Sequence, residues 1–169
     1  MPIFLDGAKV LGRFKNMRIS YFIMKLAHTI TLSVFSKDDR EASKKALIGM
    51  LPFSLEDEKL KLDVQKAEGM EKNLIMILKL RLTKARHTNA FLKSLTGKLS
   101  DDTKQLLLRQ LESRLDGKLD FFLRFDKQKL LQGQYCLTDS GDCFHIRMAI
   151  AAFPRKKEIA KKIVIEIFS

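Results

Sequence analysis

Apolar and polar residues alternate with a period of two in four separate runs, and no other feature constrains the fold of this chain more strongly. Successive side chains of a β-strand point to opposite faces, so such runs are typical of strands with one buried face. We therefore expect strands at residues 28–36, 59–69, 73–83 and 118–127.

Two short segments predict how strands are connected. A turn through residues 69–73 would pair the second and third runs as a hairpin. Gly141, within the segment DSGD, supplies the positive φ that a tight turn needs. It is expected to join two further strands, Gln134–Thr138 and Cys143–Phe153.

Four segments carry apolar residues every three to four positions, which predicts helices. The first begins after Ser36, where acidic residues favour a helix N-terminus, and ends before Pro52. The others span residues 84–99, 101–115 and 155–168. The stripe that the first helix is expected to bury consists of Ala42, Ala46, Leu47 and Met50.

The resulting order is β-α-β-β-α-α-β-β-β-α, in which hairpins are expected and the helices must cover one face of the strands. This order predicts an α+β fold with two layers, a mostly antiparallel sheet and helices packed on one face. Residues 26–169 are expected to form a single domain. Residues 1–25 show neither the strand period of two nor the helix spacing of three to four. They are interpreted as an N-terminal extension, either a short helix or arm or a flexible segment.

The charge of the chain is strongly positive and unevenly distributed. Lys and Arg number 32 against 20 Asp and Glu, a formal net charge of +12. Residues 76–99 hold six bases and no acid. A solvated helix face normally mixes signs, so this cluster indicates an anionic partner: nucleic acid, an anionic membrane surface or an acidic protein.

The strand alternation places several of these Lys and Arg side chains on the face of the sheet that is not expected to pack against the core. Guanidinium groups bind phosphate and aromatic rings stack on unpaired bases, so this face is expected to suit RNA. The alternative that Phe122 packs under an arm or a loop stays open. The residues expected on this face are Thr31, Ser33, Lys79, Arg81, Phe122, Arg124, His145 and Arg147.

No sequence motif for catalysis is present: the nucleophile elbow, the phosphate-binding loop and the zinc-protease helix are all missing. Asp142, Cys143 and His145 lack a fourth metal ligand, and we expect neither a metal nor a cofactor. Cys136 and Cys143 are expected to be reduced. The longest apolar runs fall short of the ~20 residues that span a bilayer, so we expect a cytoplasmic protein without membrane contact.

The segment LRFDKQKLLQGQYCLTDSGDCFHIRMAIAAFPRKKE resembles the C-terminal signature of a small archaeal family of RNA-binding or exosome-associated proteins. Phe125 and Phe153 depart from the family's usual Leu and Tyr, and both changes are compatible with a strand. The likeness covers about residues 26–168. It is carried by Leu123, Arg124, Asp126, Lys127, Gln128, Gly133, Asp142, His145, Pro154 and Arg155–Lys157.

This resemblance implies the fold of the ribosomal protein that carries 5S rRNA, and a non-catalytic RNA-binding role, with the exosome or ribosomal components as further partners. Arg124 is expected on the open face, with Asp126 holding Arg124 or a backbone amide. Lys127 and Gln128 are expected to leave the strand edge toward the ligand, unless they only shape the strand exit. The full set of RNA-binding candidates is Lys79, Arg81, Lys84, Arg86, Phe122, Arg124, Lys127, Gln128, His145, Arg147, Arg155, Lys156 and Lys157.

A second class of function stays open at this point. The last predicted helix is rich in lysine and would let the protein dock an acidic partner within an RNA-processing complex. These lysines are Lys156, Lys157, Lys161 and Lys162. The sequence leaves open whether the protein is a monomer or a homodimer.

Overall fold

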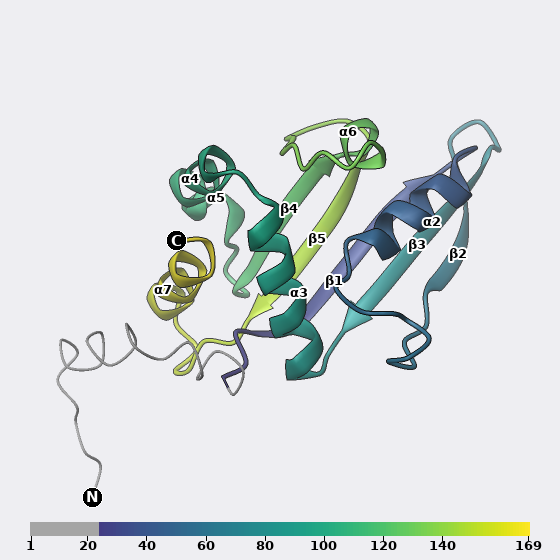
Figure 1. Cartoon of the computed structure of the whole chain (residues 1–169). Coiled ribbons are helices and arrows are strands. Elements are labelled where there is room, and N and C mark those ends of the chain that lie inside the picture. The colour runs from purple at the N-terminus through teal and green to yellow at the C-terminus, as the bar shows by residue number, and fades with distance from the viewer. Residues whose placement is uncertain (1–23) are drawn as a thin grey trace, which may run out of the picture.

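A five-stranded antiparallel sheet with helices on one face forms the body of the protein (Figure 1), as a computed structural model of residues 24–169 shows. The predicted α+β class is therefore confirmed. The predicted N-terminal extension lies outside the described residues except for its last two. The elements are β1 (Ala27–Ser36), α2 (Arg40–Gly49), β2 (Asp63–Glu68), β3 (Leu74–Leu82), α3 (Ala85–Lys98), α4 (Asp101–Arg109), α5 (Leu111–Arg114), β4 (Asp120–Asp126), α6 (Lys127–Leu131), β5 (Cys143–Ile150) and α7 (Lys157–Phe168).

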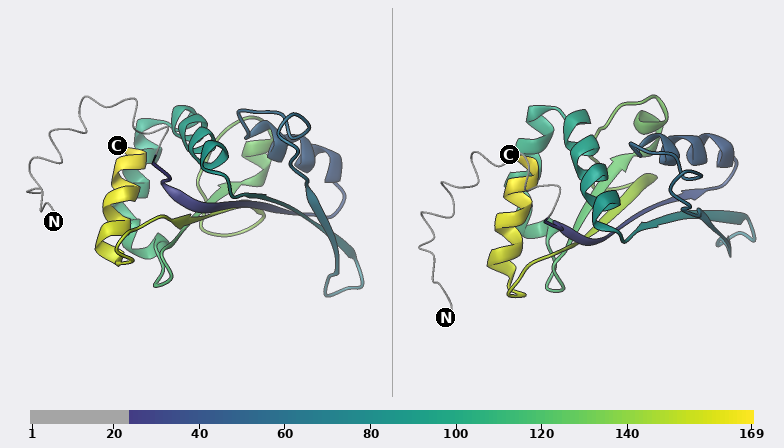
Figure 2. Two further views of the ribbon diagram at one scale, coloured as in Figure 1. Left: turned by 90° about the horizontal axis from the view of Figure 1, so that it is seen from below. Right: turned by 60° about the horizontal axis from the view of Figure 1, so that its bottom comes forward.

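The strands lie in the order β2-β3-β1-β5-β4, so β1 is central. β1 pairs antiparallel with β3 on one side and with β5 on the other. β2 and β3 form the hairpin predicted from the turn at residues 69–73, where the Gly69 amide donates to the Asn73 carbonyl at 2.8 Å. Figure 2 shows this hairpin curling away from the helical layer.

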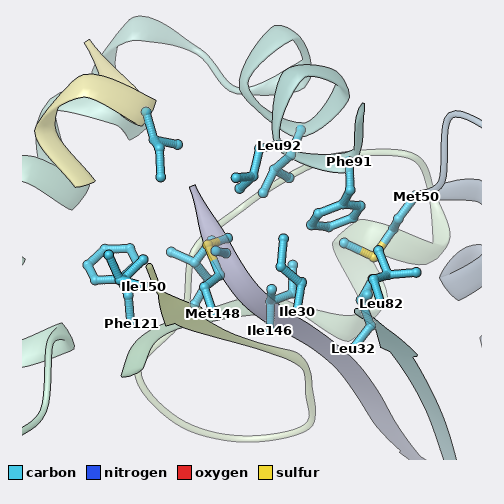
Figure 3. Close-up of a cluster of buried hydrophobic side chains, with 14 of the residues drawn as sticks. Ile30, Leu32, Met50, Leu82, Phe91, Leu92, Phe121, Ile146, Met148 and Ile150 are labelled. Atoms are coloured by element: carbon cyan, nitrogen blue, oxygen red, sulfur yellow. The ribbon is translucent and has the colours of Figure 1, made fainter. Parts of the chain in front are cut away.

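The core lies between the sheet and the helices, and the period-two alternation accounts for it. Ile30 and Leu32 of β1 and Ile146 and Met148 of β5 point toward the helices, where Phe91 of α3 covers them (Figure 3). Fully burying a side chain of this kind stabilises the fold by roughly 1.5–3 kcal/mol. The burial fixes which face of each strand is left for solvent.

Both edge strands of the sheet offer little opportunity for a further strand to pair with them, for different reasons. Along β4, the amide of Thr138 donates to the carbonyl of Arg124, and the amide of Asp126 donates to the carbonyl of Cys136. The guanidinium of Arg114 donates to the Phe122 carbonyl. The opposite edge, β2, is only six residues long and carries exposed charged side chains.

Two predicted elements differ from the structure. Gln134–Thr138 is not a regular strand: only Leu137 forms a bridge, to Phe125 of β4. β5 already lies between β1 and β4, so neither of its edges is free to form the predicted hairpin. Gly141 does adopt the expected positive φ, at 83°. The predicted helix 101–115 divides into α4 and α5 at Gln110.

The face that α2 buries is also shifted from the prediction. Ala42 is exposed, and Ser43 takes its place among the buried residues beside Leu47. The helix therefore turns a face toward β1 that includes one hydroxyl. In the part of the chain that the structure describes, no helix combines the length and the apolar character that crossing a membrane requires.

Candidate nucleic-acid interface

The face of the sheet away from the helices carries a compact set of cationic and aromatic side chains. The strand registers align them in two rows that cross β3, β1, β5 and β4. The first row is Arg81, Thr31, Arg147 and Phe122, and the second is Lys79, Ser33, His145 and Arg124. All eight residues expected on the open face of the sheet therefore occupy adjacent positions.

A shallow groove of about 520 Å³ runs over this face. Cations from two strands line it, and none of the residues lining it is acidic. Two partly exposed rings, Phe35 and Phe122, also border the groove. Its lining residues are Thr29, Thr31, Ser33, Phe35, Lys79, Arg81, Phe122, His145, Ile146, Arg147 and Ala149.

The cations of the groove differ in how firmly they are held. Lys79 and Arg81 are exposed, and neither contacts an acid within residues 24–169. Arg147 donates from Nε and Nη2 to Oδ2 of Asp120, at 2.9 and 2.5 Å. These hydrogen bonds raise the pKa of Arg147, yet its side chain remains 57% exposed. Asp120 therefore orients Arg147 without removing it from the groove.

His145 supplies a ring at the floor of the groove. Burial lowers the pKa of His145, and the nearby guanidinium of Arg124 lowers it further. The ring is consequently neutral near pH 7. It meets the ring of Phe35 edge-to-face with centroids 6.3 Å apart, and its Nε2 lies 3.3 Å from Sγ of Cys143. A neutral ring of this kind suits contact with a base better than contact with a phosphate.

Arg124 lies on the open face, as expected, and donates to the carbonyl of Asp139 at 3.3 Å. Asp126 does not hold Arg124. Its carboxylate accepts from the amide of Lys129 at 2.9 Å and caps α6, which is the backbone-amide alternative.

The expectation that Lys127 points toward a ligand is wrong. Its side chain is only 2% exposed, and its ammonium donates to the carbonyl of Phe35 at 2.7 Å. It also forms ion pairs with Asp39 at 2.9 Å and Asp142 at 3.2 Å. Lys127 thus joins β1, the start of α2 and the 139–142 turn. Gln128 is exposed, but on α6, which packs against α2 on the helical side.

Lys84 and Arg86 lie beyond the end of β3, outside the groove lining. Arg86 pairs with Glu58 at 2.5 Å. His87, which the sequence did not single out, is buried and contacts the same carboxylate at 2.7 Å. The hydrogen bond with His87, and secondarily the charges of Arg86 and Lys84, hold the pKa of Glu58 below its ordinary value against the opposing effect of desolvation.

The C-terminal candidates are separate from the groove as well. Arg155 donates to the carbonyl of Lys118 at 3.1 Å, and Lys156 is exposed. Lys157 pairs with Glu112 at 3.2 Å, and Lys161 contacts the same carboxylate. Two of the four lysines proposed to dock an acidic partner are therefore engaged with an acid of this chain.

Four groove-lining residues were not among the eight expected on the open face: Thr29, Phe35, Ile146 and Ala149. Phe35 continues the alternation of Thr31 and Ser33 by one more step, so its place on the open face could have been deduced. Cys136 and Cys143 are both free thiols, the first exposed and the second buried. Among the described residues, no three His, Cys, Asp or Glu side chains gather as a metal site.

The fold and the site together define an α+β protein with a cationic, ring-bordered groove on an open sheet. The chain belongs to the RNA-binding family, described as "RNA binding", whose model matches residues 29–150. It is 31% identical over 142 residues to the RNA-binding protein PAB1135 of Pyrococcus abyssi, covering 83% of this chain and 92% of that protein.

Two solved structures share the fold. Protein AF2318 from Archaeoglobus fulgidus, described as DUF54, is 27% identical with a TM-score of 0.73, covering 83% of this chain and 99% of that one. Mth689, a DUF54 protein from Methanothermobacter thermautotrophicus, is 27% identical with a TM-score of 0.69, covering 85% of this chain and 99% of that one. The resemblance to an archaeal RNA-binding family is thereby confirmed.

Proposed function

We propose that this protein binds RNA in the groove on the open face of its sheet, without acting on it chemically. Lys79, Arg81 and Arg147 would contact phosphates, while Phe35 and Phe122 would stack on unpaired bases. The observation that carries the proposal is the grouping of three cations with no acid in the groove lining. The family description and the name of the Pyrococcus abyssi relative support RNA as the ligand.

Charge and ring exposure together favour a polyanion with accessible bases. Lys79 and Arg81 form no ion pair within the described chain, although Asp63 of β2 lies directly opposite Lys79 in the strand register. Phe122 of β4 is 37% exposed and lies directly opposite Arg147 of β5 in the strand register. An aromatic ring beside a guanidinium can contact a base and a neighbouring phosphate at the same time. This pairing favours a nucleic acid over the surface of another protein as the ligand.

Replacing Lys79 and Arg81 together by alanine should weaken binding of a single-stranded oligouridine by about tenfold at low salt. Each lost phosphate contact on a single strand lowers the slope of log K against log salt by about 0.7, so the pair should lower it by about 1.4. Filter binding over a salt series measures both quantities. The matched control is Lys44→Ala with Lys45→Ala, which removes the same charge from the exposed surface of α2.

The control variant should keep the wild-type salt slope. If both double variants lose affinity equally, general charge and not the groove attracts the RNA. An unchanged affinity and slope in the Lys79→Ala, Arg81→Ala variant would remove the groove from consideration as the binding site.

Phe122→Ala should weaken binding of the same RNA by about five- to tenfold, because one base loses its stacking partner. The salt slope should stay unchanged, since no cation is removed. Val64→Ala is the matched control: Val64 is equally exposed, at 37%, and pairs with Leu78 on the helical side of the sheet. A loss of affinity together with a smaller salt slope would show that Phe122 acts only by positioning Arg147.

The resemblance to exosome-associated proteins supports a further proposal, that the bound RNA is shared with a larger RNA-processing assembly such as the exosome or the ribosome-processing machinery. Affinity purification with and without ribonuclease tests it: partners held through RNA should be lost after digestion. The alternative, docking of an acidic partner by α7, has less support because Lys157 and Lys161 already contact Glu112.

A further inference from the structure

A column of hydroxyl groups forms the floor of the groove. Thr29, Thr31 and Ser33 follow one another on the open side of β1, the central strand, and all three line the groove. All three are only partly exposed. Within the described part of the chain, none of these hydroxyls has a hydrogen-bond partner. Each can donate one hydrogen bond and accept two, and that capacity is unused.

Two of these hydroxyls each lie between two groove side chains: Thr31 lies between two guanidinium groups, and Ser33 lies between an ammonium and a neutral imidazole. Thr31 pairs with Arg81 of β3 and with Arg147 of β5. Ser33 pairs with Lys79 of β3 and with His145 of β5. Neighbouring strands are about 4.8 Å apart, so the Thr31 hydroxyl is one strand away from a phosphate-binding guanidinium on either side, and the Ser33 hydroxyl is one strand away from the ammonium of Lys79.

This spacing matches the chemistry of a ribonucleotide. In RNA the 2′-hydroxyl of the ribose is the neighbour of the phosphate on its 3′ side, so a cation that holds the phosphate brings the 2′-hydroxyl to an adjacent position. DNA has no hydrogen-bonding group there, and the 2′-hydroxyl is the feature by which proteins distinguish the two. When a ligand without 2′-hydroxyls covers the groove, the threonine and serine hydroxyls lose water without gaining a hydrogen bond. The affinity for that ligand is therefore lower.

We propose that Thr31 and Ser33, assisted by Thr29, contact the ribose 2′-hydroxyls of a single-stranded RNA, so that the groove selects RNA over DNA of the same base sequence. This inference rests on the proposed function and adds the class of sugar to it. The strand itself does not require these hydroxyls, since valine suits a β-strand as well as threonine does. The polar atom is what needs an explanation.

The test compares the affinity of the full chain for single-stranded oligouridine and for oligodeoxyuridine, before and after Thr31→Val with Ser33→Ala. The wild type should prefer the RNA by about tenfold, equivalent to 1.4 kcal/mol. The variant should bind both within about twofold, with an unchanged salt slope because no charge is lost. Thr31→Ser keeps the hydroxyl and should retain the preference. The matched control, Thr96→Val with Ser113→Ala, removes hydroxyls from α3 and α5.

Equal wild-type affinity for RNA and DNA overturns the inference but leaves the proposed function standing. An equal loss for both ligands in the Thr31→Val, Ser33→Ala variant also overturns it, because the hydroxyls would then contact phosphate. Failure of the wild type to bind either ligand contradicts the proposed function itself. An undiminished preference in the variant assigns the sugar recognition to other residues and refutes the role of the column.

Discussion

Lys127→Ala should lower the free energy of unfolding by about 2–4 kcal/mol, because it removes a long buried side chain and leaves the Phe35 carbonyl without its charged donor. The Lys127 ammonium is nearly inaccessible and satisfies the Phe35 carbonyl, Asp39 and Asp142 at once. Without it, a main-chain carbonyl at the end of β1 and two neighbouring carboxylates lose their common partner. Urea unfolding followed by circular dichroism measures the change.

Lys129→Ala provides the matched control on the same short helix. Lys129 is exposed, and its side chain takes no part in the Lys127 contacts, so the change in stability should stay within about 0.5 kcal/mol. If the two variants were equally stable, the ion pairs of Lys127 would contribute nothing net to folding, and the buried lysine would need another reason.

The Lys127 contacts also predict a pH dependence. Burial acts to raise the pKa of Asp39, but hydrogen bonds from Lys127 and Ser36 outweigh it and hold the pKa below its ordinary value. A carboxyl group with a depressed folded-state pKa contributes stability above the unfolded value of about 4 and loses it as the pH falls further. The stability gap between wild type and Lys127→Ala should therefore narrow below about pH 4.

Arg147→Ala should destabilise the fold by about 2–4 kcal/mol, although the arginine itself is largely exposed. Its partner Asp120 is only 5% exposed, and the substitution leaves a buried carboxylate without its two hydrogen bonds. Arg81→Ala is the control: it removes a groove cation that has no acidic partner among the described residues and should cost less than about 0.5 kcal/mol.

Both arginines should matter for RNA, so their different effects on stability separate the two roles of Arg147. Thermal melts of the single variants give the difference directly. If Arg147→Ala melts at the same temperature as Arg81→Ala, solvent already screens the Asp120 contact and Arg147 serves only the ligand. Asp120→Asn changes the other partner of the Asp120–Arg147 contact while keeping the arginine. In contrast to Arg147→Ala, it should cause little loss of RNA affinity.

The open face could be predicted from the sequence because a strand has only two faces and the core takes one of them. Lys79, Arg81, Arg124 and Arg147 follow directly from that rule, and the hairpin turn fixes the partner of β3. The rule also extends to Phe35, which was overlooked. Local periodicity is sufficient for residues whose position depends on the strand to which they belong.

The role of Lys127 could not be predicted in this way. Its partners Phe35 and Asp39 lie 92 and 88 residues away in the sequence, and nothing in the local run Asp126–Gln128 indicates them. The irregular pairing of Gln134–Thr138 could not be predicted from the local sequence either. Only the order of the strands shows that β5 has no free edge, and that order is a property of the whole sheet.

The hydrogen bonds along the edge of β4 affect how copies of the protein can associate at high concentration. A strand from another molecule would add to a sheet wherever amides and carbonyls stand unused. At β4, Thr138, Cys136 and Arg114 already occupy several of them. Open-ended polymerisation requires two receptive sides on every molecule. In the described chain only the short, charged β2 strand remains, so growth by strand addition should stop at a pair.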